Sequence, residues 1–266
     1  MTSLSEELRN NLIANTCDKE RLVSLIEQGA DVNWCEGGPY PGHSSLTLVI
    51  DFDIGNEIEV VEILIKYGAS VNHRDMFGVY PLLLSIQKER HDISILLLEN
   101  GANPNIIGEA NRSPLQLVCL GYEKNVTNNL CYLCEDYHIL VELLLANNAS
   151  VNHQDRHGNT VLMDMCICRY DYKVSPLPGM KLLLDHPDID IDLVNNGYLS
   201  GQTALGLLTS VLGENDILKI ELFEDHIFQK KLLIVQKRLA LGKLFYSSLG
   251  ENLVEEGLYE KISSFV

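Results

Sequence analysis

The chain has 266 residues, 46% of them hydrophobic and 21% charged, an ordinary globular composition that is long enough for one large domain or two small ones. Its 37 acidic and 20 basic side chains give a net charge of −17, which argues against nucleic acid and anionic membranes as partners. Seven cysteines, an odd number in a chain too large to need disulfide staples, favour a reducing, intracellular (cytoplasmic) setting.

The N-terminal segment 8–28 predicts a helical unit that is apolar on one side only. Leu12, Ile13 and Ala14 supply the apolar face. The other positions are polar and are expected to face water: Arg9, Asn10, Asn11 and Asn15. The first residues lack the basic region and apolar core of a secretory signal, and no apolar run approaches the ~20 residues of a membrane span. We therefore expect neither a signal peptide nor a transmembrane segment.

One pentapeptide recurs five times along the chain. Its copies begin at Gly29, Gly68, Gly101, Asn148 and, in degenerate form, Asp188, and the shortest step between copies is 33 residues. A leucine stands four residues before every copy: Leu25, Leu64, Leu97, Leu144 and Leu184. A second apolar residue stands five before four of them: Ile63, Leu96, Leu143 and Leu183. This stripe predicts a buried helix face, and the glycine or asparagine predicts a left-handed residue that ends the helix.

A second element follows each pentapeptide in the same phase. It consists of a Ser, Thr or Tyr two residues before a leucine, as in Ser113-Pro114-Leu115, and the other copies begin at Ser44, Tyr80, Thr160 and Thr203. A residue tolerant of positive φ stands two positions earlier: Gly42, Gly78, Asn111, Gly158 or Gly201. Because Ser and Thr cap helices and Pro fits the first turn, each copy predicts a tight turn followed by a helix.

The two elements together resemble the ankyrin repeat, over about residues 8–208. The resemblance implies an all-α solenoid in which each repeat projects a short β-hairpin finger from two antiparallel helices. No single unit can bury its apolar face without neighbours, so the repeats must stack. The expected organisation is an ankyrin-repeat domain at 1–208 with an N-terminal half-repeat cap at 1–28. Fingers 1 to 5 are expected near 29–43, 68–79, 101–112, 148–159 and 188–202.

Insertions separate the two helices of a repeat at 121–138 and at 169–179, and edges of this kind often bind. After residue 208 the repeat fades, and 209–266 is expected to form a helical C-terminal cap packed on the last repeat. One helix of this cap carries basic residues and no acid: Lys230, Lys231, Lys237, Arg238 and Lys243. It is either a solvated outer face or a contact for an acidic partner or anionic lipid.

The first insertion contains part of a zinc-site pattern. Cys131, Cys134 and His138 follow one another at short spacing, with Cys119 nearby in sequence. Because the second half of a typical site is missing, buried packing of the cysteines is the favoured interpretation, and no metal or cofactor is predicted. No nucleophile, base and orienting group are evident, and the part outside the repeats is short for a catalytic domain. The prediction is a protein that is not an enzyme.

The resemblance implies that a protein partner binds the finger tips and the exposed face of each first helix. Carried over by position, the contact residues are Trp34, Glu36, His73, Met76, Phe77, Val79, Gln87, Lys88, Ile106, Ile107, Glu109, His153, Arg156, His157, Asn159, Leu193 and Tyr198. Several are large and apolar where turns are normally polar, and they predict a binding ridge: Trp34, Met76, Phe77, Ile106, Ile107 and Tyr198. The alternative is that neighbouring fingers pack these side chains on each other.

The leading prediction is thus a non-catalytic protein–protein interaction module, monomeric on its own, with a protein partner and no nucleic acid. Irregular ankyrin arrays with private insertions also resemble pathogen effectors delivered into a host cell. One alternative is a metalloprotein or enzyme with its site in 121–138 or in the C-terminal cap. Another is an adaptor whose basic C-terminal helix recruits a second partner. The finger asparagines also resemble the sites of an asparaginyl hydroxylase: Asn33, Asn72, Asn105 and Asn152.

Overall fold

The computed structural model describes residues 3–14, 17–35, 41–52, 54–124, 135–167, 177–197, 201–210, 221, 223–227 and 229–230. The chain forms two compact units, Met1–Ile220 and Glu221–Val266. The helices of the first unit are α1 (Leu4–Leu12), α2 (Lys19–Glu27), α3 (Ser45–Asp51), α4 (Glu57–Lys66), α5 (Pro81–Gln87), α6 (His91–Glu99), the 3-10 helix η1 (Glu109–Asn111), α7 (Pro114–Lys124), α8 (Glu135–Ala146), α9 (Val161–Ile167), α10 (Leu177–Leu184) and α11 (Ala204–Ser210). In the second unit, 223–227 and 229–230 are helical. The placement of a C-terminal cap on the last repeat stays a prediction.

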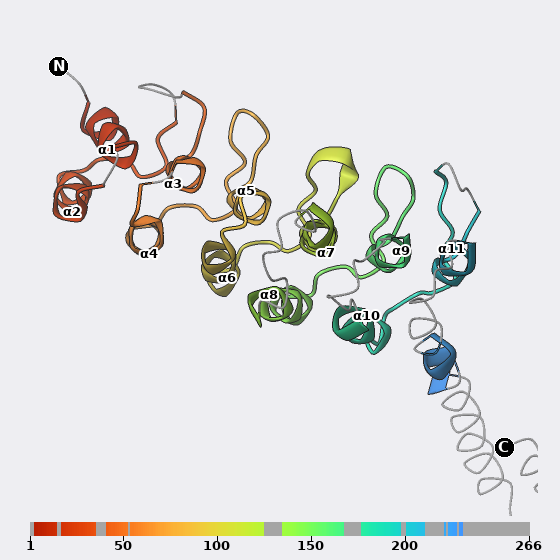
Figure 1. Ribbon diagram of the computed structural model, residues 1–266. Coiled ribbons are helices and arrows are strands. Elements are labelled where there is room, and N and C mark those ends of the chain that lie inside the picture. The colour runs from red at the N-terminus through yellow and green to blue at the C-terminus, as the bar shows by residue number, and fades with distance from the viewer. Residues whose placement is uncertain are drawn as a thin grey trace, which may run out of the picture. The chain divides into compact units, whose positions relative to one another are not determined.

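The helices of the first unit lie in two rows (Figure 1). One row is α1, α3, α5, α7, α9 and α11, each in contact with the next, and the other contains α4, α6, α8 and α10. Contacts also join successive helices across the rows, as in α1 with α2 and α5 with α6. The loops that precede α3, α5, α7, α9 and α11 project away from both rows (Figure 1). These loops stand at the positions of the predicted fingers, and we use that name for them. None of their described residues forms a strand, so the β-hairpin form stays a prediction, whereas the unit is the expected all-α repeat solenoid.

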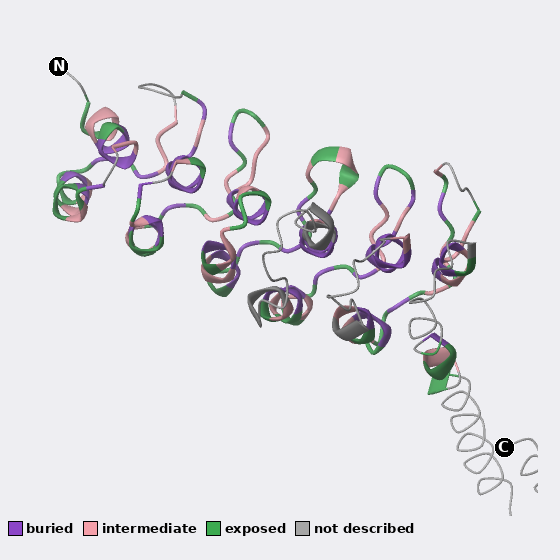
Figure 2. Ribbon diagram, in the orientation of Figure 1, coloured by how far each residue is buried: buried purple, intermediate pink, exposed green. Residues whose placement is uncertain are grey.

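The apolar stripe ahead of each pentapeptide forms the contact between helices. All five leucines four residues before a copy are buried, and burying each contributes roughly 1.5–3 kcal/mol. Figure 2 shows buried residues along the helices and exposed residues at the ends of the fingers. The positions five residues before a copy are less uniform, and here the prediction was partly wrong. Leu183 is buried, whereas Ile63, Leu96 and Leu143 are half-buried at the border of the helix face.

The turn residues have the predicted backbone. The left-handed region is occupied by Gly29, Gly68, Gly101 and Asn148 after the helices, and by Gly42, Gly78, Asn111, Gly158 and Gly201 before them. The residue that opens the second element caps its helix in most copies, since the Ser44, Ser113, Thr160 and Thr203 hydroxyls accept backbone N–H groups. In the Tyr80 copy, Pro81 occupies the first turn instead. Each element therefore begins and ends for local chemical reasons.

The N-terminal unit departs from expectation at Arg9 and Asn11. Both were predicted to face water, and both are buried. Arg9 Nη1 donates to the carbonyl oxygens of Trp34 (3.2 Å) and His43 (2.8 Å), and the guanidinium lies 5.9 Å from the Trp34 ring centroid. Burial lowers the pKa of Arg9. This side chain ties the first helix to finger 1, a long-range role that helical periodicity does not reveal.

The finger asparagines form a ladder between repeats, which the sequence reasoning missed. Each Nδ2 donates to the carbonyl of the first pentapeptide residue of the next repeat, at 2.6–3.0 Å. Each Oδ1 accepts from the N–H of the third pentapeptide residue of that next repeat, at 2.7–2.9 Å. The ladder members are Asn33, Asn72, Asn105 and Asn152. The amide has both the donor and the acceptor that this bridge needs, which explains the asparagine. Hydroxylation of these residues stays a prediction.

Candidate partner-binding site

The tip of finger 2 presents two large apolar side chains on a fixed turn. Met76 and Phe77 are 76% and 64% exposed. Beside them Asp75 is buried, and its Oδ1 accepts from the N–H groups of Phe77 (3.0 Å) and Val79 (2.8 Å). Asp75 N–H donates to the Val79 carbonyl at 2.9 Å. The buried carboxylate thus closes the turn and leaves the two apolar side chains outside it.

Finger 1 supports this tip from one side. Met76 N–H donates to the Gly42 carbonyl at 3.0 Å, and the Phe77 ring lies 4.7 Å from the His43 ring between centroids. His43 Nδ1 also lies 3.3 Å from Asp75 Oδ2. Gly42 has φ +98°, and a Cβ there would come within 3.0 Å of Met76 Cβ. Finger 2 can approach this closely because residue 42 lacks a side chain.

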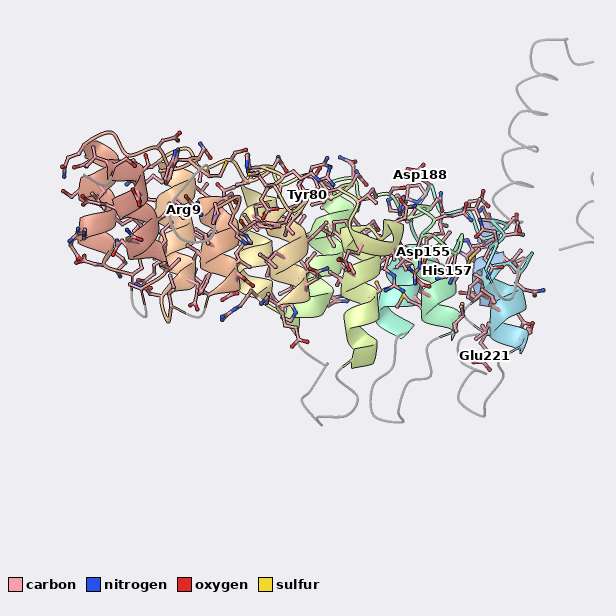
Figure 3. The ribbon with its side chains drawn as sticks, turned by 90° about the horizontal axis from the view of Figure 1, so that it is seen from above. Arg9, Tyr80, Asp155, His157, Asp188 and Glu221 are labelled. Carbon is pink, nitrogen blue, oxygen red and sulfur yellow. The ribbon has the colours of Figure 1, made fainter. Side chains whose placement is uncertain are left out.

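Finger 4 repeats the turn of finger 2 with polar side chains. Asp155 is buried, and its Oδ1 accepts from the N–H groups of His157 (2.8 Å) and Asn159 (3.0 Å). Figure 3 labels Asp155 and His157 close together on this finger. Arg156 and His157 are exposed and touch each other, with Nε donating to the ring at 3.0 Å. The same turn therefore carries an apolar pair in finger 2 and a basic pair in finger 4.

Finger 3 has a different tip. Gly108 stands where fingers 2 and 4 have the capping aspartate, and the turn closes by a Gly108 N–H bond to the Arg112 carbonyl at 2.9 Å. Ala110 and Asn111 both take left-handed backbones, with φ 56° and 60°. Such a backbone costs about 1–3 kcal/mol at Ala110, whereas asparagine at position 111 tolerates it. Without the carboxylate, the tip becomes the 3-10 turn η1.

The remaining predicted contact residues differ widely in exposure. Ile106 is 7% exposed, so its proposed place in an apolar ridge was wrong, and the side chain belongs to the core. Ile107 is 38% exposed and stays in the ridge. The other exposed members are Gln87, Lys88 and Glu109, and the half-buried ones are Trp34, His73, Val79, His153, Asn159 and Leu193. Lys88 Nζ pairs with Asp51 Oδ1 at 2.6 Å. Glu36 and Tyr198 lie outside the described residues.

Several known proteins match the chain, although no protein-family model does. An ankyrin repeat protein of Acanthamoeba polyphaga mimivirus is 30% identical over 55% of this chain and 32% of its own length. Another from the same virus is 28% identical over 43% of this chain and 71% of its length. An ankyrin repeat protein of fowlpox virus is 36% identical over 36% of this chain and 19% of its length.

These relatives are named as ankyrin repeat proteins, and the two rows of helices with projecting turns agree with an ankyrin-repeat fold. The chain is similar to these ankyrin repeat proteins, and its first unit has the fold of an ankyrin-repeat stack. It spans about a third or less of the length of the first relatives named here, apart from the shorter mimivirus protein.

Sequence reasoning missed one exposed apolar residue on the fingers of this ankyrin-repeat protein. Val194, beside the predicted Leu193, is 52% exposed on finger 5. Its carbonyl accepts from Gln154 Nε2 at 2.9 Å, which holds finger 5 against finger 4. The signal was a second apolar residue directly after Leu193, at a finger position where turns are normally polar. The structure leaves Val194 exposed and Leu193 half-buried.

The zinc-site candidates of the ankyrin-repeat protein fall in different settings. Cys119 is buried in α7, and burial raises the pKa of its thiol to about 12. A zinc ligand must be a thiolate, so this environment favours packing. His138 Nε2 lies 3.3 Å from Glu142 Oε1 on α8, while Cys131 and Cys134 lie outside the described residues. Within the described part of the chain, no three potential ligands cluster, and no helix is long and apolar enough to cross a membrane.

Proposed function

We propose that this ankyrin-repeat protein is a non-catalytic recognition module that binds a protein partner through the tips of its fingers. The observation that carries the proposal is the Met76–Phe77 pair, two large apolar side chains exposed on a turn whose backbone is fixed by Asp75. Fixing the backbone in advance lowers the entropic cost of binding. Clusters of exposed aromatic and apolar residues are typical of binding hot spots.

The distribution of exposed apolar residues supports the same surface. Among the described residues, seven large apolar side chains are exposed, and four of them lie on fingers: Met76, Phe77, Ile107 and Val194. The other three are scattered over α1, α4 and α8: Leu4, Ile58 and Ile139. A partner that follows the finger tips would therefore meet four of the seven large apolar side chains that are exposed in the described part of the chain.

The test is a capture experiment with two matched variants. The tip variant carries Met76→Asp, Phe77→Asp and Val194→Asp, and the control variant carries Ile58→Asp and Ile139→Asp on the helices. Proteins captured from a lysate by the wild-type chain and the control, and lost by the tip variant, would support the proposal. Capture that survives the tip changes, with helical content unchanged by circular dichroism, would sink it.

The finer proposal is that the partner belongs to a host cell. Ankyrin repeat proteins of mimivirus, fowlpox virus and Rickettsia bellii are among the matched relatives, and this supports the idea of an effector. The matched protein glp-1 of Caenorhabditis elegans does not bear on it. The capture is therefore run on lysates of the source organism and of a candidate host. Specific retention from the host lysate alone is the expected result. Retention only from the source lysate would contradict the effector role and leave the recognition module intact.

A further inference from the structure

Neighbouring fingers are joined at their tips by one recurring backbone bond. In each case the donor is the backbone N–H of the residue eight positions after the first pentapeptide residue. The acceptor is a backbone carbonyl at the tip of the preceding finger. Met76 donates to Gly42 (3.0 Å), Arg156 to Ala110 (2.9 Å) and Asn196 to His157 (2.9 Å). These bonds join fingers 1 and 2, 3 and 4, and 4 and 5.

The joint between fingers 2 and 3 lacks this bond. By position, the pair would be the Glu109 N–H and the Phe77 carbonyl, and both residues are exposed. Within the described residues, neither backbone group has a hydrogen-bond partner. At the base of the same joint the ladder is intact, because Asn72 bridges Gly101 (2.9 Å) and Asn103 (2.7 Å). The two fingers are thus bonded at the base, whereas the recurring backbone bond is absent at the tip.

The tip of finger 3 is bonded to finger 4 instead. Its polar groups are used toward finger 4, where Asn111 Nδ2 donates to the Gln154 carbonyl (2.8 Å) and His153 Nε2 lies 2.7 Å from the Asn111 carbonyl. The left-handed backbone of Ala110 turns the chain in this direction. Finger 3 therefore forms one bonded group with fingers 4 and 5, and finger 2 forms another with finger 1.

We propose that an extended segment of the protein partner docks at this joint by strand addition. Its carbonyl accepts from the Glu109 N–H, its N–H donates to the Phe77 carbonyl, and its apolar side chain packs on Met76 and Phe77. Strand addition gives affinity through main-chain bonds and specificity through alternate side chains. This inference rests on the proposed function and specifies the form of the partner at the finger tips.

Charge further defines the segment. Glu109 places an exposed carboxylate at the joint of a chain whose net charge is −17. The nearby Arg74 is turned onto its own finger, with Nε donating to the Gly78 carbonyl at 3.2 Å and the guanidinium near the Tyr80 ring. A lysine or arginine in the segment is therefore favoured next to the apolar residue.

Glu109→Pro tests the backbone bond directly, because proline has no N–H to donate. The substitution fits the local backbone. Glu109 opens a 3-10 turn, and Gly108 before it is extended (φ −101°, ψ −156°), as the residue before proline must be. The Glu109 N–H makes no bond within the described residues, so the free chain should keep its thermal midpoint. Glu109→Ala, which keeps the N–H, is the matched control.

The probe is a random 12-residue peptide library displayed on phage and selected on the full chain. The best peptide is then synthesised and titrated by calorimetry against each variant. We expect Glu109→Pro and Phe77→Asp each to weaken binding at least tenfold, and Glu109→Ala to weaken it only two- to fivefold. Amide exchange gives a second readout. The Glu109 amide should exchange faster than those of Met76 and Arg156 in the free chain and become protected with peptide bound.

The outcomes separate this inference from the function on which it rests. If Phe77→Asp abolishes binding but Glu109→Pro does not, the backbone docking is overturned and the finger-tip proposal stands. If the library yields no binder while the capture experiment succeeds, the partner is not an extended segment. Concentration-dependent dimerisation that Glu109→Pro abolishes would assign the joint to a second copy of the chain and overturn the inference.

Discussion

Fingers 2 and 3 follow one another at the shortest step of the array and share the same base, yet their tips differ. Both begin at a left-handed glycine and carry a ladder asparagine, Asn72 or Asn105. Asp75 caps the turn of finger 2, whereas Gly108 stands at the equivalent position of finger 3. Finger 2 thus has a carboxylate-capped turn, whereas finger 3, which lacks the aspartate, has a 3-10 turn with two left-handed residues.

The difference teaches that repeat identity and tip identity are set independently. The base is fixed by buried leucines and the asparagine ladder, which recur in each repeat. The tip is fixed by a buried aspartate that accepts two backbone N–H groups in fingers 2 and 4, and by a backbone bond from Gly108 to Arg112 in finger 3. A repeat array can therefore vary its binding edge with little cost to its core.

The largest expected effect is the removal of the cap of finger 2. Asp75→Ala removes a buried acceptor from two N–H groups and should lower the free energy of unfolding by about 3 kcal/mol. Urea denaturation followed by circular dichroism measures it. The control Glu109→Ala changes an exposed acid of finger 3 and should cost under about 0.5 kcal/mol. Equal losses for the two variants would contradict the role of the carboxylate.

The contact of finger 1 with finger 2 comes next. Gly42→Ala puts a Cβ at φ +98° and within 3.0 Å of Met76 Cβ, so it should cost about 2 kcal/mol. Gly29→Ala is matched in backbone, with φ +101° and nothing within 4 Å, and should cost about 1 kcal/mol. The difference between the two denaturation curves isolates the contact. A Gly29 variant as unstable as the Gly42 variant would leave backbone strain as the whole effect.

The bond between fingers 3 and 4 is weaker. Asn111→Gly keeps the left-handed backbone and loses only the bond to the Gln154 carbonyl, so about 1 kcal/mol should be lost. Asn111→Ala adds backbone strain and should be less stable than Asn111→Gly. Thermal unfolding ranks the two variants. The reverse order would contradict the strain of the left-handed backbone, and an unchanged stability of Asn111→Gly would show that the side-chain bond does not hold this turn.

The rate at which cysteine thiols are alkylated should distinguish buried cysteines of the core from the cysteine of finger 1. This measurement needs no change in the stability of the protein at neutral pH. Burial raises the pKa of Cys119 to about 12 and that of Cys17 to about 11, so both thiols stay protonated at pH 8. Iodoacetamide should label Cys35, which is half-buried in finger 1, and spare the other two until urea is added. Mass spectrometry of the peptides reads this out, and rapid native labelling of Cys119 would refute its burial.

The raised thiol pKa values of Cys17 and Cys119 also determine how the free energy of unfolding changes at alkaline pH. An unfolded thiol has a pKa near 9.0, so the unfolded chain loses these protons first as the pH rises. The stabilisation is complete below about pH 9 and is lost progressively toward pH 12. Cys119→Ala should therefore unfold with a smaller dependence on pH in that window.

The sequence by itself determined the repeats, their phase and the residues that start and end the helices. It could do so because these features are local: a left-handed turn needs glycine or asparagine, and a buried helix face needs leucine at a fixed spacing. The five leucines and the nine turn residues met these expectations.

Only the tertiary structure decided which residues of the fingers are exposed and how the finger tips pair. Ile106 is buried and Ile107 exposed, although the sequence treats them alike. Arg9 is buried because carbonyls of Trp34 and His43, more than twenty residues away, accept its hydrogen bonds. Turns have no period, so the environment of their side chains depends on such distant contacts. The bond missing between Phe77 and Glu109 belongs to the same class, and it defines the site proposed for the partner.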